Sequence, residues 1–193
     1  MRPSPPRCRT AVRIVLAVTA ASLAGGAQAG DLPFYSALYA RTAPRIDGVL
    51  DEACWRHAEQ TAAFTQIGGA PADVPTHAML CWDAHTLYVA FVCSEPLMSD
   101  LEARIARDDV GAFDESVELF LDPTRDRFSY LQLRVDMLGN RDTHQRNDPA
   151  DELTDRWAGA AQRSTDGWTV EIAVSFSLLS AAPPQGSTLW GCN

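Results

Sequence analysis

Apolar and polar side chains alternate with a period of two along several short stretches of the chain, which is the pattern of strands that bury one face. Turn-forming residues separate these stretches. The strands that the pattern predicts cover residues 31–44, 76–82, 87–93, 116–122, 130–136, 168–174 and 188–192. Four residues separate the second stretch from the third, so we expect these two strands to form a hairpin.

Helical patterns are confined to two short segments. A turn at Asp47-Gly48 leads into one predicted helix, which we expect Asp51 to cap. Ser99 and Glu102 have the spacing of a capping box and predict the start of the other. Because strands dominate and no β-α-β rhythm is present, the sequence predicts an all-β fold. We expect an antiparallel β-sandwich, jelly-roll or immunoglobulin-like, with one or two short helices.

The fourth and fifth predicted strands each have one apolar face and one face that carries functional groups. Glu118 and Phe120 share a face of the fourth strand, and Gln132, Arg134 and Asp136 share a face of the fifth. If the two strands pair, these five side chains form one patch on the sheet. The patch is the main candidate for a binding site. The alternative is that these side chains form a solvated sheet face with weak surface ion pairs and bind no ligand.

The first 29 residues have the pattern of a secretory leader. A basic segment precedes a short apolar run, and Ala27-Gln28-Ala29 forms a cleavage site before Gly30. The apolar run is too short to span a bilayer. We therefore expect cleavage of a signal peptide at residues 1–29, no membrane insertion of the remainder, and one domain at residues 30–193 that is periplasmic or secreted.

The net charge of the chain limits the classes of ligand that it can bind. The formal charge is −9, removal of four leader arginines would take it to −13, and every cation in the chain is arginine. An acidic domain without a basic stripe is poorly suited to nucleic acid or to an anionic membrane surface. A neutral or cationic ligand fits better.

Four cysteines follow the leader: Cys54, Cys81, Cys93 and Cys192. They have no spacing suited to zinc, so disulfides or buried thiols are expected in an oxidising compartment, with three connectivities open. Cys81 and Cys93 point to opposite sides of the predicted hairpin and cannot join each other. A disulfide would therefore join one of these two to Cys54 or to Cys192.

Five motifs stand in order along the chain: RIDGVLDEACW, LCWDAHTLYVAF, FDESVELFLDP, DGWTVEIAVSFSLL and LWGCN. With them the chain resembles the family 9 carbohydrate-binding modules and their periplasmic relatives over residues 45–193. The resemblance implies a non-catalytic β-sandwich that binds a sugar or the end of an oligosaccharide, often as an accessory to glycoside hydrolases. In the family pattern a Glu, an Arg and an Asn bind the sugar, and these positions are Glu118, Arg134 and Asp136 here.

The departures from the family pattern concern the aromatic clamp. One clamping Trp is expected where this chain has Ala112, and the other lies beyond Asn193, so the resemblance implies a C-terminally truncated module. A stacked Trp contributes about 2 kcal/mol, so its loss weakens binding about 30-fold. We expect Phe113, Phe120 or Trp157 to cover the sugar ring instead.

Some members of the family that the chain resembles carry a structural calcium ion, so the resemblance implies a candidate calcium site here. Its ligands here would be Glu95, Asp109 and Asp122, whereas turn formation is the alternative role of such residues. No other cofactor is expected.

The sequence offers three alternatives to sugar binding. A glycosidase needs one protonated carboxyl group, and an arginine between two carboxylates disfavours that state. A haem site could use Met79, Met98 or Met137 with His77 or His144, although no haem motif is present. The third alternative is a scaffold or interaction domain that has lost sugar binding.

Overall fold

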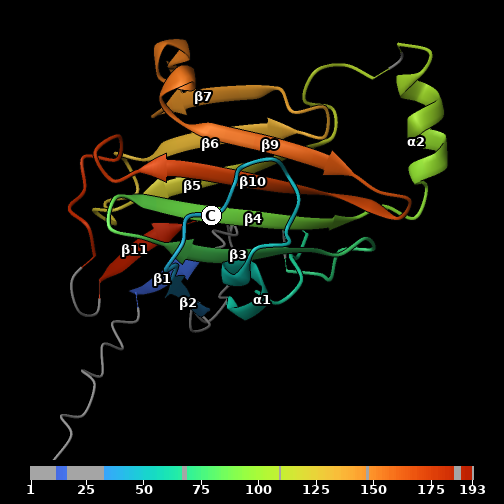
Figure 1. The fold of residues 1–193 in the computed structure, drawn as a ribbon. Helices are drawn as coiled ribbons and strands as arrows, with labels where there is room; N and C mark the ends of the chain where they lie inside the picture. Colours follow the sequence, from blue (N-terminus) through green and yellow to red (C-terminus); the bar gives the residue numbers. More distant parts are fainter. Residues whose placement is uncertain are drawn as a thin grey trace, which may run out of the picture.

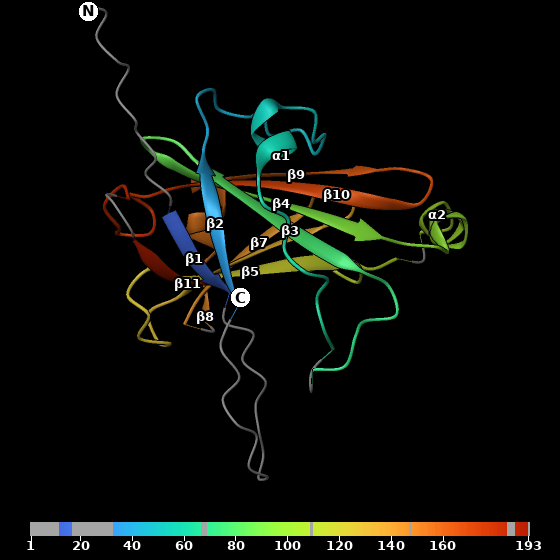
Figure 2. The same ribbon diagram turned by 90° about the horizontal axis from the view of Figure 1, so that it is seen from below.

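The computed structural model describes residues 12–16, 33–66, 69–108, 110–146, 148–184 and 188–192. These residues form two layers of strands packed face to face, a β-sandwich (Figures 1 and 2). The first sheet has the order β8 (Asp148–Pro149), β7 (Arg141–Gln145), β6 (Leu131–Asp136), β5 (Ser116–Asp122), β11 (Leu189–Cys192) and β1 (Val12–Leu16). The second has the order β2 (Phe34–Tyr39), β3 (Thr76–Trp82), β4 (Thr86–Ser94), β10 (Gly167–Ser175) and β9 (Ala158–Arg163). The remaining elements are α1 (Ala53–His57), α2 (Met98–Ile105) and the 3-10 helix η1 (Asp151–Arg156).

The predicted sandwich is confirmed, but its pairing is not wholly antiparallel. β1 pairs with β11 in parallel, and β2 pairs with β3 in parallel. Because β1 also pairs with β2, hydrogen bonding continues from one layer into the other. The predicted hairpin of β3 and β4 is present, with Trp82 opposite Leu87.

Strands β7, β8 and β9 were not predicted. β7 and β9 have the sequences RDTHQ and AGAAQR, which lack the alternation of large apolar and polar residues that marks the other strands. Short side chains are needed in β9: a Cβ at Gly159 would lie 2.7 Å from the Trp157 ring and 3.0 Å from a Val135 methyl group. β9 is therefore a strand because of its packing across the sandwich, and not because of an alternation of apolar and polar residues in its sequence.

The interior lies between the sheets and has the composition that alternation predicts. Leu119 of β5 and Leu133 of β6 face Ile172 of β10, and all three are at most 2 % exposed. Each such side chain contributes about 2 kcal/mol through burial. The opposite faces of β5 and β6 consequently point out of the sandwich, and Glu118, Gln132 and Arg134 lie on them.

The predicted helix caps are wrong in detail. The N-cap of α1 is Glu52 rather than Asp51, and the N-cap of α2 is Leu97 rather than a Ser99 capping box; neither makes a side-chain capping bond. Glu95 instead accepts a hydrogen bond from the Leu97 N–H at 2.8 Å. Both helices are short, so packing against the sheets holds them.

The outer face of the second sheet is covered by the chain from residue 41 to residue 61. Under this segment Glu171 of β10 is fully buried. Its carboxylate accepts hydrogen bonds from the backbone N–H groups of Asp47 (3.0 Å) and Gly48 (2.9 Å) and from the Trp55 indole (2.7 Å). Gly48 has φ +83°, and a Cβ there would lie 2.6 Å from the Ala161 carbonyl carbon, so the turn requires glycine. Two separate sequence motifs therefore meet at one buried carboxylate.

Strand β1 lies within the segment predicted as a leader, and the rest of residues 1–29 lies outside the described residues. Cleavage before Gly30 stays a prediction. Among the described residues, none of the helices combines the length and the apolar character needed to cross a membrane.

Candidate functional site

The predicted patch lies on the outer face of the first sheet and centres on Arg134. Glu118 of β5, Arg134 of β6 and Asp142 of β7 stand directly opposite one another across three adjacent strands. The Arg134 guanidinium hydrogen-bonds the Asp142 carboxylate and lies 3.9 Å from the nearer Glu118 oxygen. The side chains of Glu118, Arg134 and Asp142 are 40 %, 26 % and 19 % exposed. We call these three residues the charged row.

A second cross-strand row lies beside the charged row. Phe120, Gln132 and His144 are opposite one another in β5, β6 and β7. The Gln132 amide donates to the second Glu118 oxygen at 2.9 Å, and the His144 Nδ1 lies 3.6 Å from Asp142. Gln132 therefore orients the carboxylate that Arg134 approaches from the other side.

Aromatic rings flank the charged row on both sides. The Arg134 guanidinium carbon lies 4.1 Å from the centre of the Phe113 ring, which is a cation–π distance. On the other side Phe120 packs against Tyr130, with ring centres 5.6 Å apart. All three rings are partly exposed. The arrangement places hydrogen-bonding groups between apolar surfaces, which is the composition of a site for a small polar ligand with apolar faces.

Two buried polar atoms at this site make no hydrogen bond to another described residue. They are the Nε of Arg134 and the Nδ1 of His144, which lies 3.6 Å from the Asp142 carboxylate. A buried polar atom without a partner costs about 1–3 kcal/mol, so a ligand or water that pairs with it gains the same amount. Both atoms belong to the patch that the alternation pattern predicts or lie next to it.

Asp136 does not belong to the binding surface, and its predicted role was wrong. It is 1 % exposed, and its carboxylate accepts hydrogen bonds from the backbone of Phe113, Leu138 and Asn140 and from the Asn140 amide, at 2.7–3.1 Å. The residue ends β6, where the chain turns at Gly139 (φ +86°) into β7. Asp136 therefore fixes the β6–β7 turn and the Phe113 loop, and does not face a ligand.

Trp157 is also not a platform for a ligand. It is 5 % exposed, and its indole N–H donates to the buried Thr143 hydroxyl at 2.8 Å. The ring packs in the interior against Gly159, and Arg141 lies 5.3 Å from its centre. The polar sequence before Trp157 suggested exposure, but that sequence forms η1, and Trp157 enters the core directly after it.

The residues predicted to bind calcium do not form one site. Glu95 lies near Glu115, whose pKa is raised by burial and further by the Glu95 charge. Glu115 precedes β5 and Asp122 ends it, a separation of about 23 Å along a strand. Asp122 is 8 % exposed and accepts from the Thr124 hydroxyl and the Arg127 N–H. Asp109 lies outside the described residues.

The candidate haem ligands are likewise separated. Met98 and Met137 are each 2 % exposed and belong to the interior. His77 and Met79 lie on β3, whereas His144 lies on β7 of the other sheet, and the His77 ring bonds the Thr61 carbonyl. In the part of the chain that the structure describes, no three His, Cys, Asp or Glu side chains cluster in a way that could hold a metal ion.

Asp142, His144 and Tyr130 are site residues that the sequence pattern did not select. Asp142 and His144 alternate in β7, a strand whose inward positions include the polar Thr143, so no apolar period marked it. The signal that could have found them is the Gly139-Asn140 turn, which predicts that the next residues return beside β6.

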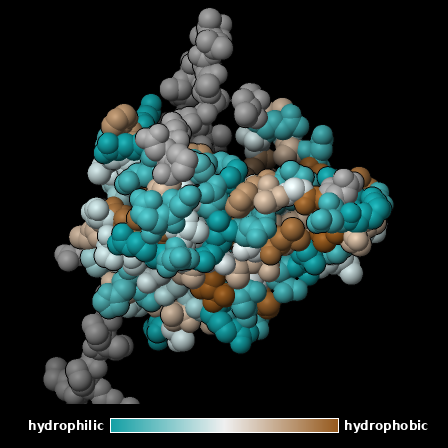
Figure 3. Space-filling model, turned by 90° about the horizontal axis from the view of Figure 1, so that it is seen from above, coloured by the Kyte–Doolittle hydropathy of each residue, from teal (hydrophilic) through white to brown (hydrophobic). Residues whose placement is uncertain are grey.

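The end of the molecule next to β7 is largely polar. Figure 3 looks onto the end of the molecule that carries β7, η1 and α2; hydrophilic residues cover most of it, and hydrophobic ones gather only in small areas. A hollow lined by Pro123, Thr124, Ala182 and Trp190, among others, lies near the end of β5 and has no charged side chain in its lining. The charged row is therefore the better candidate for specific recognition.

Comparison with known proteins gives one family and a consistent fold. The family described as "Carbohydrate family 9 binding domain-like" matches residues 46–191. Two structures of a family 9 carbohydrate-binding module from Caldicellulosiruptor kristjanssonii are similar to this chain. The structure in complex with cellotriose is 25 % identical, covers 80 % of this chain and 73 % of that chain, and has a TM-score of 0.57. The structure in complex with glucose is 24 % identical, covers 81 % of this chain and 73 % of that chain, and has a TM-score of 0.58. A structure from Bacteroides uniformis shares the fold at 10 % identity, covering 75 % of this chain and 73 % of that chain, with a TM-score of 0.52. None of the curated proteins matches the chain significantly.

Proposed function

This chain belongs to the carbohydrate family 9 binding domain-like family, and on that premise we propose that it binds a sugar or the end of an oligosaccharide on the outer face of the first sheet. The binding is non-catalytic. The observation that carries the proposal is the charged row between aromatic rings, because it combines hydrogen-bonding groups with apolar faces. The two C. kristjanssonii modules in complex with cellotriose and glucose support the ligand class.

Each group in the site has a role in the proposed recognition. Arg134 donates to sugar hydroxyl oxygens through the exposed part of its guanidinium, since the side chain is 26 % exposed. Glu118 is the most exposed member of the charged row and accepts from sugar hydroxyls. Asp142 holds the guanidinium in place from β7. Phe120 with Tyr130 covers an apolar face of the sugar ring, and the Phe113 ring stacks on the Arg134 guanidinium.

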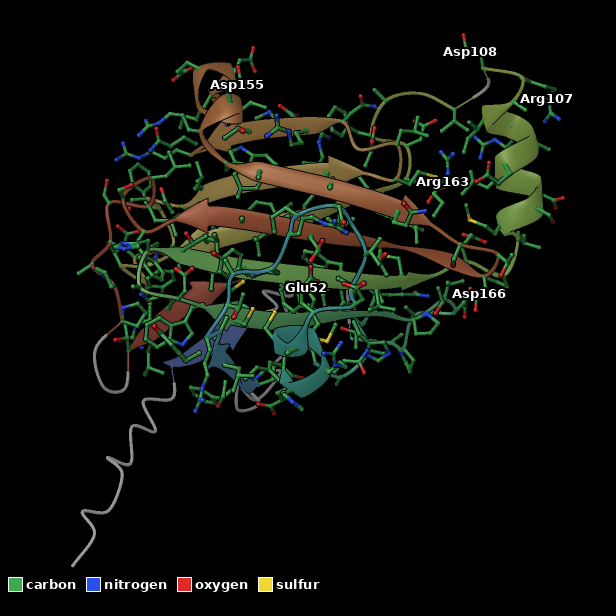
Figure 4. All side chains as sticks on the ribbon, viewed as in Figure 1. Glu52, Arg107, Asp108, Asp155, Arg163 and Asp166 are labelled. Carbon is green, nitrogen blue, oxygen red and sulfur yellow. The ribbon has the colours of Figure 1, made fainter. Side chains whose placement is uncertain are left out.

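Calorimetric titration with glucose, cello-oligosaccharides and xylo-oligosaccharides tests the proposal. Arg134→Ala should weaken binding at least tenfold, because a charged hydrogen-bonding partner contributes about 1.5–3 kcal/mol. Arg163→Ala is the matched control. Arg163 also pairs with a carboxylate (Glu102, 2.9 Å), but it ends β9 in the other sheet and points toward α2 (Figure 4).

Two results would reject the proposed site. Equal affinity of Arg134→Ala and the wild-type chain for the same sugar would place binding elsewhere. No heat from any of the three sugar classes would favour the alternative, a scaffold that has lost sugar binding. A colourless purified protein would argue against the haem alternative, and a Soret band near 410 nm would argue for it.

We also propose that the chain is exported to the periplasm or secreted, and that it assists the breakdown of polysaccharides. The leader pattern of residues 1–29 supports export. The mass of the protein recovered from the periplasm or the medium tests it: a chain that begins at Gly30 is expected. A full-length chain retained in the cytoplasm would contradict it.

A further inference from the structure

The outer face of the second sheet has its own small core, separate from the interior between the sheets. It consists of Ala40, Cys54, Trp55, Cys81, Tyr88 and Ala90, and we call it the outer core. Cys54 of α1 is 7 % exposed and Cys81 of β3 is fully buried. Cys93 and Cys192 belong to the interior cluster, on the other side of the sheet.

The backbone places Cys54 over Cys81. After α1 the chain returns antiparallel to β3, with Gln60 opposite Met79 and the Thr61 N–H bonded to the Ala78 carbonyl at 2.9 Å. Continued by two residues, this register puts Ala58 opposite Cys81.

Cys54 lies one helical turn before Ala58. The Ala58 N–H donates to the Cys54 carbonyl at 2.9 Å, so both residues lie on the same side of α1. This side of α1 rests on β3, where Cys54 and Cys81 are free, buried thiols of one cluster and lie within reach of each other. Register and proximity thus agree.

We infer that Cys54 and Cys81 are a disulfide-forming pair, the cross-link that the sequence left open among three connectivities. In the reaction the two thiols lose two protons and two electrons to a disulfide of the glutathione type. One S–S bond forms between Cys54 and Cys81, and the oxidant's S–S bond is reduced to two thiols.

The cross-link would hold α1 on β3, and α1 has little else of its own to stabilise it. α1 has five residues and no side-chain cap, yet it carries Trp55, which holds the buried Glu171. Burial raises the pKa of both thiols, which slows their reaction in the folded chain. The disulfide therefore forms during folding or when α1 opens.

Peptide mapping after oxidative refolding tests the pair. The full chain is refolded from urea in reduced and oxidised glutathione, free thiols are alkylated, and the protein is digested. Trypsin separates Cys54 (residues 46–56) from Cys192 (residues 164–193) but leaves Cys81 and Cys93 in one peptide. Chymotrypsin, which cuts after Trp82, Tyr88 and Phe91, then separates these two.

A linked peptide pair that contains Cys54 and Cys81 is the expected result, and Cys93→Ala should retain it. The oxidised chain should also unfold about 5–10 °C higher than the reduced chain, and Cys54→Ala should abolish that difference. The inference is overturned if Cys54 and Cys81 are both alkylated after oxidative refolding, or if either is linked to Cys8, Cys93 or Cys192. Because the mapping uses the wild-type chain, its outcome does not depend on whether a variant folds.

Discussion

Two glutamates stand in nearly the same local sequence, Val117-Glu118-Leu119 in β5 and Val170-Glu171-Ile172 in β10. In both strands the neighbouring apolar residues fill the interior, so both glutamates point outward from their sheets. The chain from residue 41 to residue 61 covers Glu171, which is fully buried and accepts three hydrogen bonds. The Glu118 side chain is 40 % exposed and lies in the charged row. Whether an outward residue serves the fold or a ligand depends on what lies over it, which the period of a strand does not encode.

The largest expected effect comes from removing the covered glutamate. Glu171→Ala should lower the free energy of unfolding by about 4 kcal/mol, because it leaves three buried donors without an acceptor and opens a cavity. Glu171→Gln should cost about 2 kcal/mol, since its amide N–H₂ then faces at least one of those donors. Urea denaturation measures both. If Glu171→Ala were as stable as the wild type, the contrast between the two glutamates would fail.

The two glutamates also show which features of the site can be predicted from the sequence. Alternation correctly placed Glu118, Gln132 and Arg134 on one outer face, because the apolar residues between them leave one possible orientation. It could not distinguish Asp136, which has the same period but ends its strand, where a turn and a loop close over it.

Other errors have the same physical origin. Trp157 was expected near the surface because polar residues precede it, but the depth of a side chain depends on the opposite sheet. Strand β7, which supplies Asp142, has no apolar period, because its inward Thr143 is satisfied by hydrogen bonds to Trp157 and Thr154. The two parallel strand pairs depend on contacts between distant segments, which local patterns do not contain.

The second expected effect is on affinity. Glu118→Ala should weaken sugar binding about tenfold, because it removes a charged acceptor, while changing the free energy of unfolding by less than about 0.5 kcal/mol. Titration and urea denaturation of the same preparation measure the two quantities. A large loss of stability with unchanged affinity would reverse the roles that we assign to the two glutamates.

The third effect is a pH dependence of stability that the covered glutamate should produce. Burial raises the pKa of Glu171 above its usual 4.5, and its three hydrogen bonds offset this only in part. The folded chain therefore binds this proton more tightly than the unfolded chain, so its contribution to stability is complete below pH 4.5 and declines as the pH rises through the raised value. Glu171→Gln lacks this titration. The stability difference between wild type and variant should thus shrink from pH 4 to pH 7, and a difference that grows would contradict the assignment.

The smallest effect separates Trp157 from the binding site. Trp157→Phe should cost about 1 kcal/mol of stability, through the lost hydrogen bond to Thr143, and should leave sugar affinity unchanged. Phe120→Ala is the matched aromatic substitution on the outer face, and it should weaken binding with little loss of stability. Equal affinities for Trp157→Phe and Phe120→Ala would show that the outer aromatic pair does not contact the ligand.

The buried carboxylate of Asp136 has a consequence for how this surface can change. It anchors the Phe113 loop and the β6–β7 turn from inside the protein, whereas the neighbouring Ala112 is exposed. The backbone next to residue 112 is thus held by a carboxylate that is buried away from the surface. If sugar binds at the site that we propose, substitutions at residue 112 should alter which sugar is selected while the anchor and the sheet stay the same.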